Sequence, residues 1–152
     1  MTTLLDDSLI AAIQLRPRTP NAWIVSAEAP KEALAVKMYI ELMRWRDLKS
    51  ISDGLLKRSS GGGEAHSFIY LPHEDYLELP VSEPCVLVDA FTEFVYLSVR
   101  AFDALMLRFM RAAIEVAIKE KNDVLKEPWW PDVLAAADAL EQRARERAYG
   151  AP

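Results

Sequence analysis

The fold is decided by the stretch CVLVDAFTEFVYLSVRAFDALMLRFMRAAIEVAIKEK, residues 85–121, in which no glycine or proline occurs. Its polar side chains recur mostly three or four residues apart, and they are Asp89, Glu93, Tyr96, Arg100, Asp103, Arg111, Glu115 and Lys119. One narrow polar stripe on an otherwise apolar segment predicts a helix that other elements nearly surround. A continuous helix here would be about 55 Å long at 1.5 Å per residue, so we expect a kink or a break within it.

Shorter helices are expected around this central one. The periodic apolar residues predict a first helix over residues 4–15 and a second over 30–48, which Asp53-Gly54 would follow as a turn. A last helix is expected over 131–148, with Arg143, Arg145 and Arg147 near its negative end. The short run 22–26 favours an edge strand or an extended connector. We therefore predict one mainly α-helical domain over residues 1–152, a helical bundle around one long central helix.

A small β-hairpin or extended excursion is predicted at about residues 67–82. Ser67 to Leu71 is rich in strand-forming residues, and Pro72 stands at the second position of an expected type I turn. Gly61, Gly62 and Gly63 precede this excursion, and their spacing matches no phosphate-binding motif. We expect the glycines to form a mobile connector, because three glycines lose much conformational entropy when ordered.

Length and cysteine content limit the class of protein. The chain has 152 residues, of which 51% are apolar, enough for a core. Cys85 is the single cysteine, which favours a reducing compartment over a disulfide framework. Acidic residues near the N-terminus do not fit an export signal, and no uncharged run approaches the roughly 20 residues of a membrane span. We therefore expect a cytoplasmic protein.

Acidic residues are concentrated in one segment. Residues 61–99 contain 7 Asp/Glu and no Lys or Arg, within a chain of net charge −5. Like charges repel, so this clustering suggests a docking surface for a basic partner. The residues expected to form the surface are Glu64, Tyr70, Glu74, Asp75, Tyr76, Glu78 and Glu83, in which the tyrosines supply anchors.

Catalytic constellations are weak in this sequence. All-α magnesium enzymes hold the ion with carboxylate pairs three residues apart, whereas Asp89 and Glu93 are four apart, with Asp103 further along the same stripe and no second acidic pair facing them. His66 and Cys85 supply a possible nucleophilic pair, and His73 begins a possible ligand run. A solvated stripe, a buried thiol and a surface turn explain these residues more simply, so we predict no catalytic residue, metal or cofactor.

The sequence thus favours a non-catalytic protein-binding module that uses an acidic surface to bind a basic partner. Small acidic immunity proteins and antitoxins, which neutralise a toxin, share this size and charge. A magnesium-dependent enzyme acting on a phosphorylated substrate is the alternative, and a self-assembling adaptor subunit is another. Nucleic acid is disfavoured because acidic residues interleave with the basic cluster that includes Arg44 and Arg46.

Overall fold

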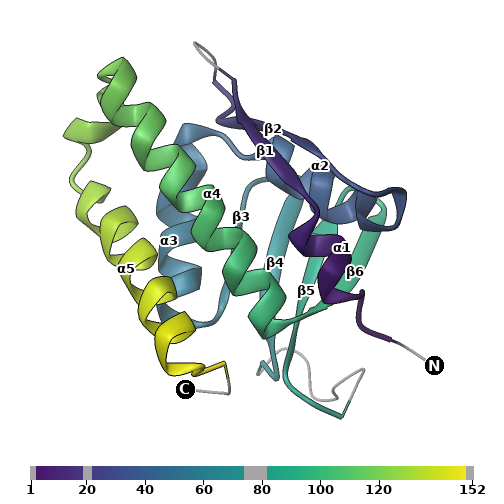
Figure 1. Cartoon of the computed structure of the whole chain (residues 1–152). Helices are drawn as coiled ribbons and strands as arrows, with labels where there is room; N and C mark the ends of the chain where they lie inside the picture. Colours follow the sequence, from purple (N-terminus) through teal and green to yellow (C-terminus); the bar gives the residue numbers. More distant parts are fainter. Residues whose placement is uncertain (1–2, 19–21, 74–81, 150–152) are drawn as a thin grey trace.

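The computed structural model describes residues 3–18, 22–73 and 82–149, and these form an α+β fold (Figure 1). Its main sheet has four antiparallel strands in the order β3-β4-β5-β6. The strands are β3 (Ser60–Gly62), β4 (His66–Leu71), β5 (Cys85–Ala90) and β6 (Glu93–Ser98). A separate two-stranded sheet pairs β1 (Gln14–Pro17) with β2 (Val25–Glu28).

Helices make up most of the remaining described chain. The α-helices are α1 (Asp7–Ala11), α2 (Leu34–Leu42), α3 (Leu48–Lys57), α4 (Val99–Glu120) and α5 (Trp130–Glu146). Three short 3-10 turns connect them, namely η1 (Lys31–Ala33), η2 (Trp45–Asp47) and η3 (Asp123–Lys126). Helix α5 packs against both α3 and α4, and α2 packs against β5 and β6.

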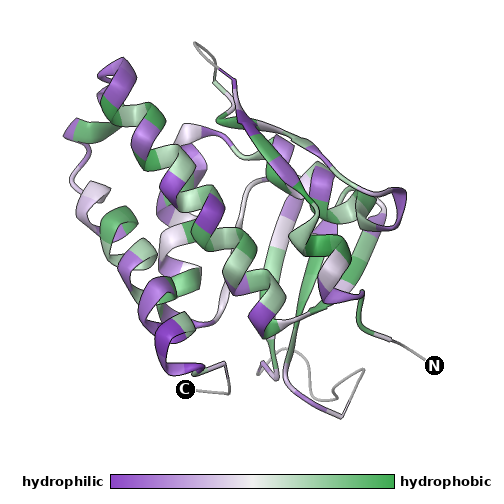
Figure 2. Ribbon diagram, viewed as in Figure 1, coloured by the Kyte–Doolittle hydropathy of each residue, from purple (hydrophilic) through white to green (hydrophobic). Residues whose placement is uncertain are grey.

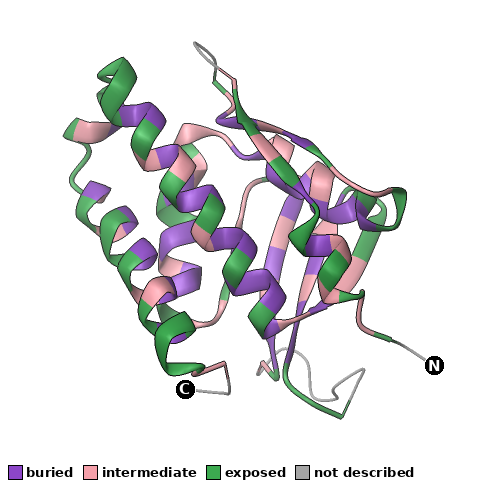
Figure 3. Cartoon of the chain, viewed as in Figure 1, coloured by how far each residue is buried: buried purple, intermediate pink, exposed green. Residues whose placement is uncertain are grey.

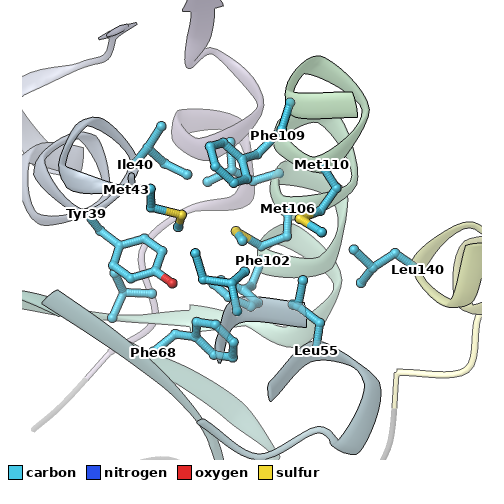
Figure 4. Close-up of a cluster of buried hydrophobic side chains, with 14 of the residues drawn as sticks. Tyr39, Ile40, Met43, Leu55, Phe68, Phe102, Met106, Phe109, Met110 and Leu140 are labelled. Carbon is cyan, nitrogen blue, oxygen red and sulfur yellow. The ribbon is translucent and has the colours of Figure 1, made fainter. Parts of the chain in front are cut away.

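The core lies between one face of the main sheet and the helices. Along each strand alternate side chains point to opposite faces, and Phe68, Val88 and Leu97 share the face that is fully buried. Figure 4 shows Tyr39 and the neighbouring α2 side chains approaching Phe102 and the next turns of α4 above Phe68. Apolar residues recur along α4 and α5 (Figure 2), and their buried residues recur with them (Figure 3).

The prediction of a mainly helical bundle is wrong. Residues 85–98 form the β5–β6 hairpin rather than the first half of a long helix, and only residues 99–120 form α4. The spacing of Asp89, Glu93 and Tyr96 imitates a helical stripe. These residues form strands and not a helix because β-branched and aromatic side chains recur among them, and such side chains pack well on a pleated, half-buried surface. Ser98 ends the hairpin and caps α4, since its hydroxyl oxygen accepts the Ala101 N–H at 3.0 Å.

Other predicted elements are shorter than expected. The first helix occupies only residues 7–11, and strand β1 follows it. The predicted helix 30–48 is interrupted at Met43, whose extended backbone ends α2, and α3 runs on through Gly54 to Lys57. The last helix matches α5 closely, since it ends at Glu146. The predicted hairpin retains β4, whereas residues 74–81 lie outside the described part.

The three glycines form structure rather than a loose connector. Gly61 and Gly62 belong to β3 and pair with Phe68 and Ser67 of β4. A Cβ on Gly61 would lie 2.7 Å from the backbone oxygen of Ser50 in α3. Glycine is therefore required where this strand crosses the helix closely.

The helices were compared with the length and apolar character of a membrane span. Among the residues that the structure describes, no helix combines the length and the apolar character needed to cross a bilayer.

Candidate functional site

The candidate site lies at the end of the main sheet where β5 turns into β6. Phe91 occupies this turn in a left-handed conformation (φ 56°), and its side chain is 63% exposed. Its backbone N–H donates to the carbonyl oxygen of Ala65 at 2.8 Å, which ties the turn to the start of β4. A positive φ is uncommon for a bulky residue, because it costs conformational energy. The fold therefore keeps Phe91 exposed at this turn although its backbone conformation is unfavourable.

Two neighbouring hollows border Phe91. The inner hollow, of about 160 Å³, is lined by Trp23, Leu42, Arg44, Arg46, Asp47, Glu64, Ala65, His66 and Phe91. The outer hollow, of about 290 Å³, is lined by Arg18, Trp23, Met38, Glu41, Leu42 and Phe91. Trp23, Leu42 and Phe91 line both, so they form an apolar ridge between two concave surfaces.

The segment after α2 positions one wall of the inner hollow. Trp23 and Arg44 form an isolated antiparallel bridge, and the Arg44 guanidinium lies 4.9 Å from the centre of the Trp23 ring. This distance is within the range of a cation–π contact. The Asp47 carboxylate accepts the Arg44 backbone N–H at 2.9 Å, which closes the η2 turn and fixes that carboxylate at the hollow.

His66 is the most deeply buried polar group that lines the inner hollow. It is 6% exposed, and its Nε2 lies 3.7 Å from Asp47 Oδ2, too far for a hydrogen bond. Within the described chain, Nε2 has no hydrogen-bond partner. Burial lowers the pKa of His66 below its usual value, although the Asp47 and Asp89 carboxylates oppose this effect. The imidazole is therefore neutral at pH 7, and Nε2 is a buried polar atom that is closed to solvent.

Neighbouring residues hold His66 in place. Its ring meets the Tyr39 ring edge-on, with 5.5 Å between the ring centres. A Cβ on Gly63 would lie 2.4 Å from His66 Cε1, so the third glycine gives this ring its space. Tyr39 is itself buried, and burial raises the pKa of its phenol well above the usual value. Tyr39 therefore acts as a packing partner and not as an acid or base.

Of the residues expected to form one acidic surface, Glu64, Tyr70 and Glu83 lie in the described part of the chain. Glu64 lines the inner hollow, whereas Glu83 precedes β5 at the opposite end of the strands. Tyr70 is only 5% exposed, and its hydroxyl donates to Asp103 at 2.5 Å, so it has no surface to offer a partner. Glu74, Asp75, Tyr76 and Glu78 lie outside the described residues.

The carboxylates expected to hold magnesium do not come together. Asp89 accepts the Ser67 hydroxyl at 3.0 Å, and Glu93 starts the edge strand β6. Asp103 is buried on α4, where the Arg143 guanidinium lies 3.7 Å from it. No group of three potential metal ligands occurs in residues 3–18, 22–73 or 82–149. Asp89, Glu93 and Asp103 therefore do not form a shared metal site in the described structure.

Cys85 and His66 are also separated. Cys85 is the first residue of β5 and pairs with Leu71, whereas His66 pairs with Ala90 at the far end of the same strand. The thiol is buried, and burial, with a smaller contribution from Glu83, raises its pKa. A thiol with a raised pKa is a poor nucleophile.

Comparisons with protein-family models, with curated proteins and with solved structures give no match to this chain. The function must therefore be argued from the site itself.

Sequence reasoning did not select Trp23, Asp47 or Phe91. No local motif marks them, because they come from three separate parts of the chain and meet only after folding. The one local signal was the basic cluster that includes Arg44 and Arg46, which the sequence disfavours as a nucleic-acid site because acidic residues interleave with it. Arg44 and Arg46 of that cluster line the inner hollow.

Proposed function

We propose that this protein is a non-catalytic binding module, that a basic protein partner docks on the ridge formed by Trp23, Leu42 and Phe91, and that it works in the cytoplasm. The observation that carries the proposal is the outward Phe91 ring between two hollows. Binding energy at interfaces is concentrated in a few aromatic and arginine residues near the centre of a concave, well-packed surface. The ridge and Arg44 supply that composition.

Two exposed carboxylates beside Phe91 support a basic partner, while Arg18, Arg44 and Arg46 also line the two hollows. Glu64 and Glu93 are exposed carboxylates at the same end of the sheet as Phe91. The segment 61–99 that contains all three has no lysine or arginine. Complementary charges at the rim of an interface mainly accelerate encounter, and this contribution weakens as salt is added.

Affinity capture from the native host tests the proposal with two matched variants. Phe91→Ala removes the exposed ring of the ridge, and Ile118→Ala removes a side chain of similar exposure, 60%, from the far end of α4. We expect one stoichiometric partner that binds the wild type and the Ile118 variant, that dissociates at high salt, and that is lost with Phe91→Ala. The proposal is contradicted if the Phe91→Ala variant captures the partner as well as the wild type does, or if no stoichiometric partner is captured.

The narrower hypothesis of an immunity protein or antitoxin has its own test. If the captured partner is a toxin, co-expression of this chain should rescue growth, and the Phe91→Ala variant should not. Rescue by both proteins would place toxin neutralisation elsewhere on the surface.

A further inference from the structure

We propose that an arginine side chain of the partner enters a third hollow, which lies between η2 and η3, and serves there as a second anchor. This inference rests on the proposed function and names a residue type that the partner must carry. The third hollow has a volume of about 320 Å³, and its lining includes Trp45, Arg46, Asp123, Val124, Glu127 and Trp129. Two half-buried indoles and two exposed carboxylates thus border one space.

The packing of α3 against α5 brings the two tryptophans to one place. Arg143, near the end of α5, donates to the Leu55 carbonyl oxygen near the end of α3. Trp45 and Trp129, which precede α3 and α5, line one hollow at the opposite end of this helix pair. Both indoles pack partly on the core and stay partly exposed, so each has surface to offer a ligand.

The η3 turn supplies an apolar base and two charges. Asn122 Oδ1 accepts the Val124 N–H at 2.9 Å, which holds the turn. Val124 is buried in the core, whereas Asp123 and Glu127 are exposed. A ligand that rests on this base therefore has carboxylates of the same turn within reach.

The chemistry of this lining fits a guanidinium. A guanidinium stacks on aromatic faces and presents a planar fork of donors to carboxylates, and lysine has no such plane. Tryptophan is the most favourable aromatic partner for a cation. The same surface already contains one such pair, because the Arg44 guanidinium lies 4.9 Å from the centre of the Trp23 ring.

Charges in the third hollow are divided between its two sides. Asp123 and Glu127 belong to the η3 side, and Arg46 belongs to η2. Lys126 lies 3.8 Å from Asp123, but both side chains are at least 85% exposed, and such a pair is weak. An incoming guanidinium is therefore attracted toward η3 and repelled by Arg46.

The third hollow adjoins the surface on which we place the partner. Arg46 lines both the inner hollow and the third hollow. A partner that covers Phe91 and the inner hollow can therefore place a second side chain beyond Arg46. Anchors of this kind fill separate pockets of one interface.

The test uses the whole chain and blocked tripeptides, observed by NMR of the Trp45 and Trp129 indole N–H groups. Acetyl-Gly-Arg-Gly-amide should shift these signals saturably, with a dissociation constant on the order of a few millimolar for a single anchor. The analogue with citrulline has nearly the same shape and no charge. It should bind at least about fivefold more weakly.

Four variants test the assigned roles. Trp129→Leu should weaken binding of the arginine peptide at least about fivefold, and Glu127→Gln about threefold. Arg46→Gln should strengthen it about twofold at low salt, since a repelling charge is removed. Glu115→Gln is the control, because Glu115 is exposed on α4 and lines none of the three hollows. If Trp129→Leu fails to fold, the exposed Glu127 and Arg46 variants still decide.

Peptide results can overturn the inference without any partner. Equal binding of the arginine and citrulline peptides, or no saturable shift by about 50 mM peptide, rules out a guanidinium site. Weaker binding of the arginine peptide by the Arg46→Gln variant would contradict the assigned charges. If capture of the partner still depends on Phe91 in these cases, the proposed function stands and only the third hollow fails.

Capture of the partner tests the source of the arginine. Glu127→Gln and Trp129→Leu should each weaken capture, and Ile118→Ala should not. If methylguanidinium and the arginine peptide bind but both variants capture the partner normally, the hollow takes a free cation and the inference is wrong. If the arginine peptide binds and the wild type captures no partner, the proposed function fails and the partner's arginine fails with it.

Discussion

Arg143 joins three helices, and its removal gives the sharpest test of how the core is held together. It lies on α5 and is 7% exposed. Its guanidinium donates to the Leu55 carbonyl oxygen at 2.5 Å, near the end of α3, and lies 3.7 Å from Asp103 on α4. Burial raises the pKa of Asp103, because desolvation outweighs the contacts with Tyr70 and Arg143 that stabilise the charge. The variant Arg143→Met would keep much of the volume and remove the charge.

The expected loss is large because Asp103 stays buried without its counter-charge. Breaking a buried pair from one side typically costs about 3–5 kcal/mol. An unfolding entropy of about 2.1 cal/mol/K per residue gives about 0.3 kcal/mol/K for this chain of 152 residues. The Tm should therefore fall by about 10–15 °C. Replacing both partners, with Asp103→Leu and Arg143→Met together, should recover most of this loss.

Thermal unfolding followed by circular dichroism measures the effect, with urea denaturation as a second readout. Arg145→Met is the matched control, since that side chain lies on the same helix, is 70% exposed and pairs with Glu141 at 3.0 Å. It should change the Tm by less than about 2 °C. The reasoning is refuted if Arg143→Met lowers the Tm by less than about 3 °C, or by no more than the control does.

Three further changes test other parts of the fold. Gly61→Ala should cost about 1–3 kcal/mol in urea denaturation, because its Cβ meets the rigid Ser50 carbonyl at 2.7 Å, and unchanged stability would contradict the close crossing. Lowering the pH from 7 to 5 should reduce the Tm, because the unfolded chain takes up a proton near pH 6.5 that buried His66, with its lowered pKa, resists. His66→Gln should flatten this dependence, and an equally steep profile in that variant would assign it to other groups. Ser98→Ala should cost about 1 kcal/mol by removing the cap on the Ala101 N–H, and a loss below a few tenths would show that the cap is dispensable.

The last helix was the most predictable part of the fold. Pro131 starts the last helix and basic residues follow near its end, and these local signals place α5 correctly. The second half of the long apolar stretch is helical for the same kind of reason, since its periodic pattern is sustained over residues 99–120. The stretch is not one helix with a break, because residues 85–98 form strands, and α4 begins after Ser98, whose hydroxyl caps it.

Strand content was the least predictable part. Residues 85–98 carry both a three-to-four-residue polar spacing and an alternation of β-branched residues, so a single window supports either structure. Pairing with β4 settles the conflict, because Val86 and Val88 then enter the core beside Tyr70 and Phe68. The glycines were misjudged in a similar way, because the close approach of α3 to β3 cannot be seen locally.

The candidate site was only partly accessible from sequence. The acidic segment did direct attention to Glu64, which lines the inner hollow. Trp23, Asp47 and Phe91 could not be found, since they are separated by at least two dozen residues and are brought together by an isolated bridge and a turn contact. The burial that gives His66 its unpartnered nitrogen is likewise a property of the packed structure.

By itself the sequence determined some local features of this protein, namely the extent of the last helix, the apolar periodicity of α4 and α5, and an acidic segment without lysine or arginine. These depend on neighbours a few residues away, where propensity and side-chain spacing act. Tertiary structure alone decided that residues 85–98 are strands, that three glycines pack tightly, and that a buried histidine faces a carboxylate beside an exposed phenylalanine. Long-range pairing and burial change the free energy of each of these conformations by more than local preference does, and no short window of sequence contains that information.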